Sequence, residues 1–390
     1  MSGKFLLIGV ILQLAGAVWV VAEDCSTGTF PVANPDNGGN TCVPCDDSNN
    51  GGIDECAECS LLTSKTRSST VLIKCTKCII NNLSPLEDDC LTDCPSGTYA
   101  ENGICKPCHE SCASCNNDPG AAFCTACYPG YVLSRAGGTP FGTCIPECTE
   151  EFGANCKTCT AVLGGSRYCS RCETGFVPVD GMCVLATARE LTAVCTPKND
   201  GTCESCKDTY FLQSGGCYQS MMYPGDTLCE LAQQGKCTTC ANLQLPERDG
   251  SCPLCATNCK VCDASNAKTC RGCFPGYYLD SVDNKCVKCT DNSNNNGNTI
   301  VGIPNCISCV PPASGNGPVT CYVVQESTND PTDLNTNKGS FSTGAIAGIS
   351  VVAVLVVGAL IGFLCWWFLC KTKHAGVSSS TTALTRPTSS

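Results

Sequence analysis

Paired cysteines two residues apart are the groups in this sequence whose type and spacing could do chemistry. Fifteen Cys-x-x-Cys pairs lie between Cys42 and Cys309. The same spacing serves redox-active dithiols, zinc-thiolate sites and structural disulfides. A redox enzyme usually carries the motif once, after a strand and at a helix N-terminus. Fifteen copies in a chain with few helix signals therefore favour structural bridges, with thiol exchange confined to a few exposed ones.

Zinc is the second chemistry that these cysteines suggest. Cys252, Cys255, Cys270 and Cys273 have the spacing of a four-thiolate site. The predicted ectodomain has a single histidine, His109, so zinc sites would depend almost entirely on cysteine. Because an oxidising secretory route opposes free thiolates, we assign no metal and no other cofactor, and keep these four residues as the zinc candidates.

An enzyme is not predicted. The sequence has no His-Glu-x-x-His, no Gly-x-Ser-x-Gly and no phosphate-cradling loop. A formal net charge of −11 argues against nucleic acid as a partner, because such binding rests on Lys and Arg.

The cysteine content indicates what stabilises the chain. Cys accounts for 42 of the 390 residues, above the 8–10% or so that marks a disulfide scaffold. In residues 23–343, Leu, Ile, Val and Phe make up only 52 of 321 residues, too few for an ordinary core. Forty cysteines lie in this segment. We expect twenty bridges to substitute for the core, with a connectivity that spacing leaves open.

Both ends carry targeting signals. Residues 1–22 have one cation, an apolar run and short residues before Glu23, as in a cleaved signal peptide. Residues 344–369 form a 26-residue run without charge, followed by Lys371 and Lys373. This pattern predicts a transmembrane helix with a cytoplasmic tail at 370–390. The expected protein is a type I single-pass protein of the plasma membrane.

The elements that position the cysteines are repeated short hairpins. After Cys127 and again after Cys273 come an aromatic residue, Pro-Gly and a tyrosine, and a further Cys closes each unit. We expect each unit to be a turn and a strand pair with a core of a few side chains, stacked end to end into a rod of furin-like or growth-factor-receptor type. The structural cysteines of the two clearest copies are Cys105, Cys108, Cys112, Cys115, Cys124, Cys127, Cys252, Cys255, Cys259, Cys262, Cys270 and Cys273.

The remaining segments complete the domain plan. The Cys-rich ectodomain is expected at 23–321, and a polar stalk without Cys at 322–343. Short helical turns are expected at 187–193 and 227–234. Asn82 begins the one glycosylation sequon, weakened by the proline after it.

Two features of the membrane segment suggest modification and pairing. Cys370 lies beside lysine at the inner membrane face and is the candidate for acylation. Small residues spaced four apart, Gly344/Gly348 and Gly358/Gly362, suggest weak association of two copies of the membrane helix.

These features resemble the variant-specific surface proteins of Giardia. The resemblance rests on the Cys-x-x-Cys repeats, on the Gly-Gly-Cys-Tyr element at 215–218, and above all on the membrane segment from Ser342 to Cys370. Family members end Cys-Arg-Gly-Lys-Ala after the helix, whereas here Lys371 and a longer tail follow Cys370. The resemblance therefore implies acylation at Cys370. It implies no role that depends on the family's Arg, because this chain has Lys371 at that position. A related high-cysteine membrane protein has the same features.

The resemblance implies a cell-surface coat antigen that resists proteases and presents variable loops for antigenic variation. Host antibodies and the membrane are then the expected partners. The alternative is a Cys-rich receptor or adhesin that binds a host protein or glycan.

Overall fold

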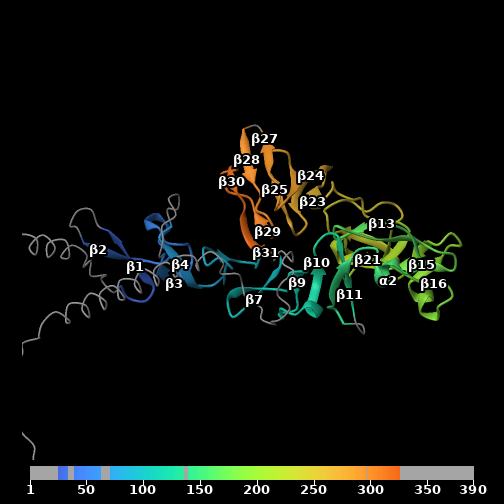
Figure 1. Cartoon of the computed structure of the whole chain (residues 1–390). Helices are drawn as coiled ribbons and strands as arrows, with labels where there is room; N and C mark the ends of the chain where they lie inside the picture. The colour runs from blue at the N-terminus through green and yellow to red at the C-terminus, as the bar shows by residue number, and fades with distance from the viewer. Residues whose placement is uncertain (1–24, 34–38, 63–70, 136–138, 296, 326–390) are drawn as a thin grey trace, which may run out of the picture. The chain divides into compact units, whose positions relative to one another are not determined.

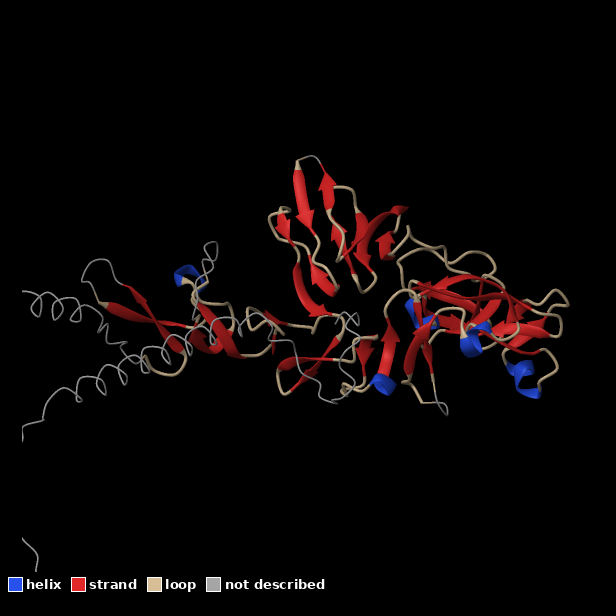
Figure 2. Cartoon of the chain, viewed as in Figure 1, coloured by secondary structure: helices blue, strands red, loops and turns tan. Residues whose placement is uncertain are grey.

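The computed structural model describes residues 25–33, 39–62, 71–135, 139–295 and 297–325. Within them the chain forms short strands joined by turns, with five helical elements of three to five residues (Figures 1 and 2). The helical elements are η1 (Ser48–Asn50), η2 (Ala121–Phe123), α2 (Glu150–Gly153), η3 (Arg189–Ala193) and η4 (Gly225–Thr227). The prediction of disulfide-rich hairpin modules with little helix is confirmed.

Most of the sheets are two-stranded antiparallel pairs. They pair β1 (Thr29–Ala33) with β2 (Asn40–Pro44), β3 (Cys56–Leu61) with β4 (Ile73–Cys78), β9 (Cys112–Cys115) with β10 (Cys124–Cys127), β11 (Tyr131–Ser134) with β12 (Thr143–Pro146), β13 (Cys156–Leu163) with β14 (Ser166–Cys172), β17 (Cys195–Pro197) with β18 (Cys203–Cys206), β21 (Cys229–Gln233) with β22 (Lys236–Cys240), β23 (Cys259–Asp263) with β24 (Asn266–Cys273), β25 (Tyr277–Asp280) with β26 (Lys285–Lys288), and β29 (Cys306–Val310) with β31 (Thr320–Val324).

Three larger sheets join elements through a parallel pair. Their strand orders are β6 (Cys90–Leu91), β5 (Asn82–Leu83), β8 (Ile104–Pro107), β7 (Thr98–Glu101); then β16 (Met182–Leu185), β15 (Phe176–Val179), β20 (Gly216–Gln219), β19 (Tyr210–Gln213); and β27 (Ser293–Asn295), β28 (Asn298–Val301), β30 (Gly317–Pro318).

The repeated hairpin predicted from the sequence is present in four copies. In each copy the strand that begins with an aromatic residue pairs with a second strand that holds the closing Cys: β11 with β12, β15 with β16, β19 with β20, and β25 with β26. In the Pro-Gly turn before β11 and β25, Gly130 and Gly276 have φ values of 94° and 87°. Only glycine adopts this backbone without strain, which explains the recurrence of Pro-Gly.

The largest core is shared between hairpins, so the expectation of one small core per unit is wrong here. Val179 in β15 pairs in parallel with Cys217 in β20, which joins two repeats into one four-stranded sheet. Tyr168 and Tyr218 are fully buried against this sheet, with ring centroids 6.4 Å apart. Both belong to a cluster that extends from Val132 to Cys252. A single hairpin has too little apolar surface to bury such rings, and several hairpins together provide it.

The two predicted helical turns have different outcomes. The turn at 187–193 is present as η3. The prediction of a helical turn at 227–234 is wrong, because Cys229–Gln233 forms β21 and pairs with β22. Cys229 is bonded to Cys237, eight residues on, and this short bridge closes a hairpin.

Several predicted segments lie outside the described residues: the signal peptide at 1–22, the stalk beyond residue 325, the membrane helix at 344–369 and the tail with Cys370. Among the residues that are described, none of the helices has the length and apolar character needed to cross a bilayer.

Candidate functional site: the cysteine junctions

All forty cysteines between Cys25 and Cys321 are paired in twenty disulfides, so the prediction of a fully bridged scaffold is confirmed. The bridges are 25–42, 45–59, 56–75, 78–90, 94–105, 108–115, 112–124, 127–144, 148–159, 156–169, 172–183, 195–203, 206–217, 229–237, 240–252, 255–262, 259–270, 273–286, 289–309 and 306–321.

Every Cys-x-x-Cys pair is split between two bridges. One cysteine of the pair bonds to a residue earlier in the chain and the other to a residue later in the chain, as Cys75 does to Cys56 and Cys78 to Cys90. A redox-active dithiol instead cycles through a bond within the motif. The pairs are therefore covalent junctions between successive loops.

The bridges close the chain into a series of units. Ten bridges join consecutive cysteines, and the other ten form five interlocked pairs such as 45–59 with 56–75. We call each simple bridge or interlocked pair, with the residues that it spans, a closed unit, and the residues between two closed units a connecting segment. Fifteen closed units and fourteen connecting segments result. Twelve connecting segments have two or three residues, and the other two are 184–194 and 218–228.

The two clearest sequence repeats have the same connectivity. Bridges 108–115, 112–124 and 127–144 correspond one for one to bridges 255–262, 259–270 and 273–286. In each copy the preceding bridge, 94–105 or 240–252, ends at the cysteine that begins the sequence repeat, Cys105 or Cys252. The cysteines assigned to the repeats on sequence grounds are thus all bonded in disulfides.

The four zinc candidates are in four different bridges. Cys252 bonds Cys240, Cys255 bonds Cys262, Cys270 bonds Cys259, and Cys273 bonds Cys286. A sulfur in a disulfide carries no thiolate charge and is not a zinc ligand of the structural kind. In this bonding state the four cysteines do not form the site that their spacing suggests.

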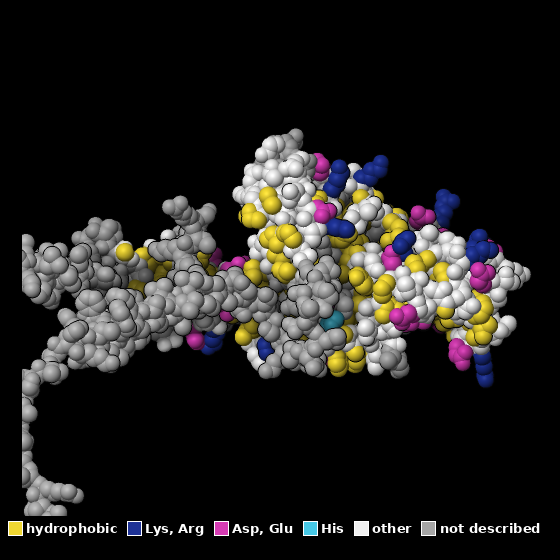
Figure 3. Space-filling model, in the orientation of Figure 1, with side chains coloured by type: hydrophobic (Ala, Val, Ile, Leu, Met, Phe, Trp, Pro, Cys, Tyr) yellow, Lys and Arg dark blue, Asp and Glu magenta, His cyan; other side chains and the backbone are white. Residues whose placement is uncertain are grey.

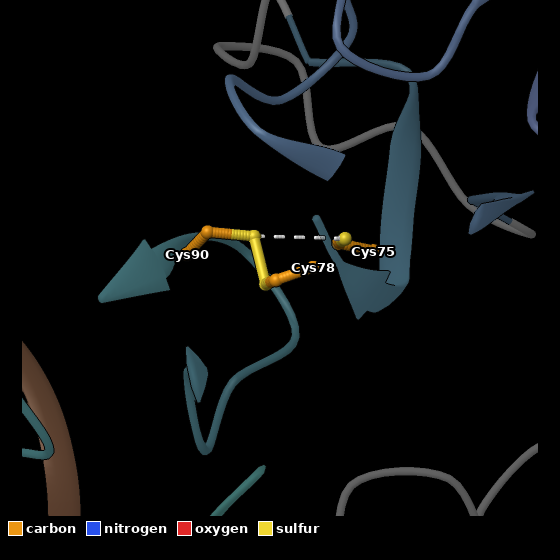
Figure 4. A group of neighbouring side chains, drawn as sticks. All are labelled: Cys75, Cys78 and Cys90. Carbon is orange, nitrogen blue, oxygen red and sulfur yellow. Dashed lines mark hydrogen bonds between the residues drawn. A yellow bond between two sulfur atoms is a disulfide. The ribbon is translucent and has the colours of Figure 1, made fainter. Parts of the chain in front are cut away.

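The junctions instead bring the sulfurs of neighbouring bridges close together. Cys75, Cys78 and Cys90 form one such group, in which the Cys75 sulfur lies 4.0 Å from the Cys90 sulfur although the two are not bonded (Figure 4). Corresponding groups are Cys156/Cys169/Cys183 and Cys259/Cys270/Cys286. Sequence reasoning missed these groups because each depends on the pairing of cysteines, which spacing alone does not determine.

The sequon serine at Ser84 is part of the folded structure. Its side chain is 1% exposed and its hydroxyl donates to the Asp88 carboxylate at 2.6 Å. Asn82 lies in β5 and its amide donates to the carbonyl of Thr92 at 3.3 Å. The acceptor candidate is thus partly buried and engaged with its neighbours. The acylation candidate Cys370 is outside the described residues.

Charged side chains of both signs are interspersed over the face seen in Figure 3. The ion pairs among the described residues include Lys74 with Glu87 at 2.5 Å, where both side chains are exposed, and Arg167 with Glu147 at 2.6 Å, where the cation is exposed and the carboxylate is partly buried. Exposed pairs of this kind contribute little to stability, about 0–1 kcal/mol each. Electrostatics here keeps the surface solvated, and the bridges hold the fold.

One carboxyl group, that of Asp180, is partly buried at the end of β15. Burial raises the pKa of Asp180 from 3.8 to about 6, against the opposing effects of the Gln219 backbone N–H and Arg135. That N–H donates to the Asp180 carboxylate at 2.8 Å. Burial likewise raises the pKa of Tyr168 and Tyr218 well above the usual range. These two hydroxyls therefore stay protonated at neutral pH.

Comparisons with known proteins agree with this architecture. The chain matches the family model for Giardia variant-specific surface protein over residues 15–236 and 230–374. It is 31% identical to major surface-labeled trophozoite antigen 417 of Giardia intestinalis over 92% of this chain and 64% of that protein. It is 31% identical to variant-specific surface protein VSP4A1 of the same organism over 90% of this chain and 45% of that protein. The chain thus spans about half to two thirds of the length of these relatives.

A more distant similarity lies in Cys-rich repeats. Human extracellular matrix organizing protein FRAS1 is 31% identical over 40% of this chain and 4% of that protein. No solved structure gives a significant match.

Proposed function

Because the chain belongs to the Giardia variant-specific surface protein family and is a cell-surface coat protein, we propose that it is a protease-resistant coat antigen, cross-linked by disulfides, that presents variable loops for antigenic variation and immune evasion. Host antibodies are the proposed partners, and no enzymatic activity is proposed. The proposal includes the features expected from the sequence: a signal peptide, a stalk, a single membrane helix and an acylated Cys370. It also includes a rod of stacked hairpins and weak pairing of membrane helices.

The observation that supports this proposal is that the two cysteines of every Cys-x-x-Cys pair belong to different bridges. A backbone cut inside a closed unit leaves both fragments joined by a bridge, so no piece is released. A cut separates the ectodomain only if it falls in a connecting segment, and most of these have two or three residues between cysteines. Loops at the tips of hairpins are thereby free to differ in sequence and to be nicked without loss of the coat.

Digestion with trypsin, with and without reductant, tests this proposal. We expect the intact ectodomain to keep most of its mass on a non-reducing gel while reduction after digestion reveals many internal cuts. Arg248 lies in the exposed loop that the 240–252 bridge closes and is a good marker for a cut that remains joined. Rapid release of small fragments without reductant would contradict the coat role.

The alternative of a receptor or adhesin has one observation in its favour. The two Pro-Gly turns of the repeats line a shared cavity of about 290 Å³ that contains Tyr128, Tyr131 and Tyr277, with Glu110 and Lys288 among its polar lining. Aromatic walls with a few polar groups are typical of ligand sites. Binding of host glycans or proteins that Tyr277→Ala abolishes, with Tyr322→Ala as a control outside the cavity lining, would favour the adhesin.

A further inference from the structure

Three junctions place an unbonded pair of sulfurs within reach of each other. The Cys270 and Cys286 sulfurs are 3.3 Å apart, those of Cys169 and Cys183 are 3.4 Å apart, and those of Cys75 and Cys90 are 4.0 Å apart. In each pair the two sulfurs belong to different bridges. Figure 4 shows the last pair, where the dashed line joins the Cys75 sulfur to the Cys78–Cys90 bridge.

The three junctions share one topology. In each, the first sulfur closes an interlocked pair and the second closes the simple loop that follows it. Cys270 closes the pair 255–262/259–270, and Cys286 closes the loop from Cys273. The same description holds for Cys169 with Cys183 and for Cys75 with Cys90. The contact recurs at three of the four junctions of this topology; at the fourth, where Cys124 and Cys144 take the corresponding places, none is seen among the described residues.

The two sulfurs of each unbonded pair differ in their exposure to solvent. Cys75, Cys169 and Cys270 are at most 2% exposed. Cys90, Cys183 and Cys286 are partly exposed. At two junctions an external thiol therefore reaches the loop bridge before the buried bridge behind it, 56–75 or 259–270, whereas at the other junction Cys156 of the inner bridge is itself partly exposed. Access is one of the factors that set the rate of thiol–disulfide exchange.

We propose that Cys90, Cys183 and Cys286 are exchange sites for small thiols, from which the free thiol passes inward to the interlocked pair. Take the third junction. A small dithiol reduces the Cys273–Cys286 bridge to two thiols and is itself oxidised to a disulfide. The Cys286 thiol loses its proton and its sulfur attacks the Cys270 sulfur. The Cys270–Cys286 bond forms, the Cys259–Cys270 bond breaks, and Cys259 leaves as a thiolate that takes up a proton.

The exchange keeps the loop closed. After the step, Cys286 is again bonded, now to Cys270, and the two free thiols are Cys273 and Cys259, the latter 4% exposed in the native bridge. The equivalent products are Cys169–Cys183 with Cys156 and Cys172 free, and Cys75–Cys90 with Cys56 and Cys78 free. This activity goes beyond the coat role and does not depend on it: a chain that resists trypsin could lack exchange, and the reverse also holds.

The new bond changes where a single cut severs the chain. In the native pairing the connecting segment of this junction is 271–272. Trypsin can cut this segment only after Arg271. In the exchanged pairing the Cys270–Cys286 bond spans that segment, and residues 263–269 become the connecting segment. The severing site therefore moves from Arg271 to Lys268.

Limited reduction of the full-length protein tests the proposal directly. The native protein is treated with less than one equivalent of dithiothreitol, quenched with acid, alkylated and mapped by mass spectrometry without further reduction. We expect peptides linked Cys270–Cys286, with alkylated Cys259 and Cys273. Alkylation of Cys273 and Cys286 together, with the Cys259–Cys270 bridge intact in the same molecules, would overturn the proposal.

A variant provides the same test without reductant. Cys273→Ser leaves Cys286 without its partner, and we expect alkylation at Cys259 in place of Cys286. The matched control is Cys94→Ser, which frees Cys105, a residue for which no sulfur–sulfur contact of this kind is seen in the described part of the chain. We expect Cys105 to remain the alkylated residue. Exchange at Cys105 as complete as at Cys286 would show that proximity plays no part and would overturn the proposal.

Discussion

The sulfurs of Cys169 and Cys172 lie 4.0 Å apart and are not bonded to each other. Cys169 instead bonds back to Cys156, and Cys172 bonds forward to Cys183. Between them are only Ser170 and Arg171. The same division at all fifteen Cys-x-x-Cys pairs reduces the places where one cut separates the chain to short, mostly strand-bound segments.

The first prediction concerns the position of the first severing cut. Five connecting segments carry a tryptic site that is not followed by proline: Lys77, Arg171, Arg189, Arg271 and Lys288. Four of these lie in paired strands, and only Arg189 lies in an exposed 3-10 turn, η3. Because proteases cut backbone that opens locally, we expect Arg189 to be cut first and Arg189→Gln to remove the earliest severed ectodomain product on a non-reducing gel.

Arg248→Gln is the matched control for this prediction. Arg248 is also exposed, but the 240–252 bridge spans it. We expect this variant to change only the fragments seen after reduction. If the wild-type ectodomain is severed at the four strand positions as fast as at Arg189, strand pairing does not protect the junctions.

The second prediction concerns a buried hydroxyl in the shared core. Tyr218 is fully buried, and its hydroxyl has no hydrogen-bond partner among the described residues. Its ring contacts Tyr168 and Phe211. Tyr218→Phe removes an unpaired polar group and keeps the ring, so we expect a gain of about 1 kcal/mol in the free energy of unfolding.

Tyr218→Ala provides the contrast. This change leaves a cavity between the rings, and we expect a loss of about 3–5 kcal/mol. Melting temperatures measured with the bridges intact compare the two variants. A Tyr218→Phe variant that melts clearly below the wild type would mean that the hydroxyl has a partner.

The sequence predicts the local parts of this architecture better than the nonlocal ones. The hairpin from Tyr131 to Pro146 follows from an aromatic strand, a glycine turn and a closing Cys, which are all close in sequence. The connectivity does not follow, because the fifteen junctions look alike locally and differ only in their partners. The shared core does not follow either, since it depends on the parallel contact of Val179 with Cys217, 38 residues away.

The third prediction concerns close packing at a hairpin tip. Gly235 lies between β21 and β22 with φ at 79°, and a Cβ atom there would lie 1.9 Å from the carbonyl oxygen of Cys206. Gly235→Ala therefore requires the backbone of a neighbouring unit to move. Gly175 has a similar φ of 90°, with no atom within 4 Å of an added Cβ. Gly175→Ala meets only backbone strain, which costs about 1–2 kcal/mol.

We expect Gly235→Ala to lower the melting temperature well below that of Gly175→Ala, and to reduce the yield of secreted protein. Both variants keep every cysteine, so thiol counting on the purified proteins checks that the bridges are complete. Equal melting temperatures would show that the contact with Cys206 is not close in solution.

The last prediction is a pH dependence that arises from Asp180. Burial raises the pKa of this carboxyl group from 3.8 to about 6, so the folded state holds a proton that the unfolded state releases between about pH 4 and pH 6. Stability is then greatest below the unfolded pKa and falls as the pH rises through 6. Asp180→Asn removes the charge, still offers an oxygen to the Gln219 N–H, and tolerates the φ of 47° at this position.

We expect Asp180→Asn to be more stable than the wild type at pH 7, by on the order of 1 kcal/mol, and equal to it near pH 4. Asp263 provides a contrast of opposite sign, because the hydroxyl of Ser265 and the guanidinium of Arg271 hold the pKa of this carboxyl well below its usual range. Its contribution is present at pH 7 and is lost only in strong acid, so Asp263→Asn should not gain stability at neutral pH. Melting temperatures from pH 4 to pH 8 measure both variants. An Asp180→Asn curve parallel to that of the wild type over this range would show that the carboxyl group titrates near its ordinary value in the folded protein.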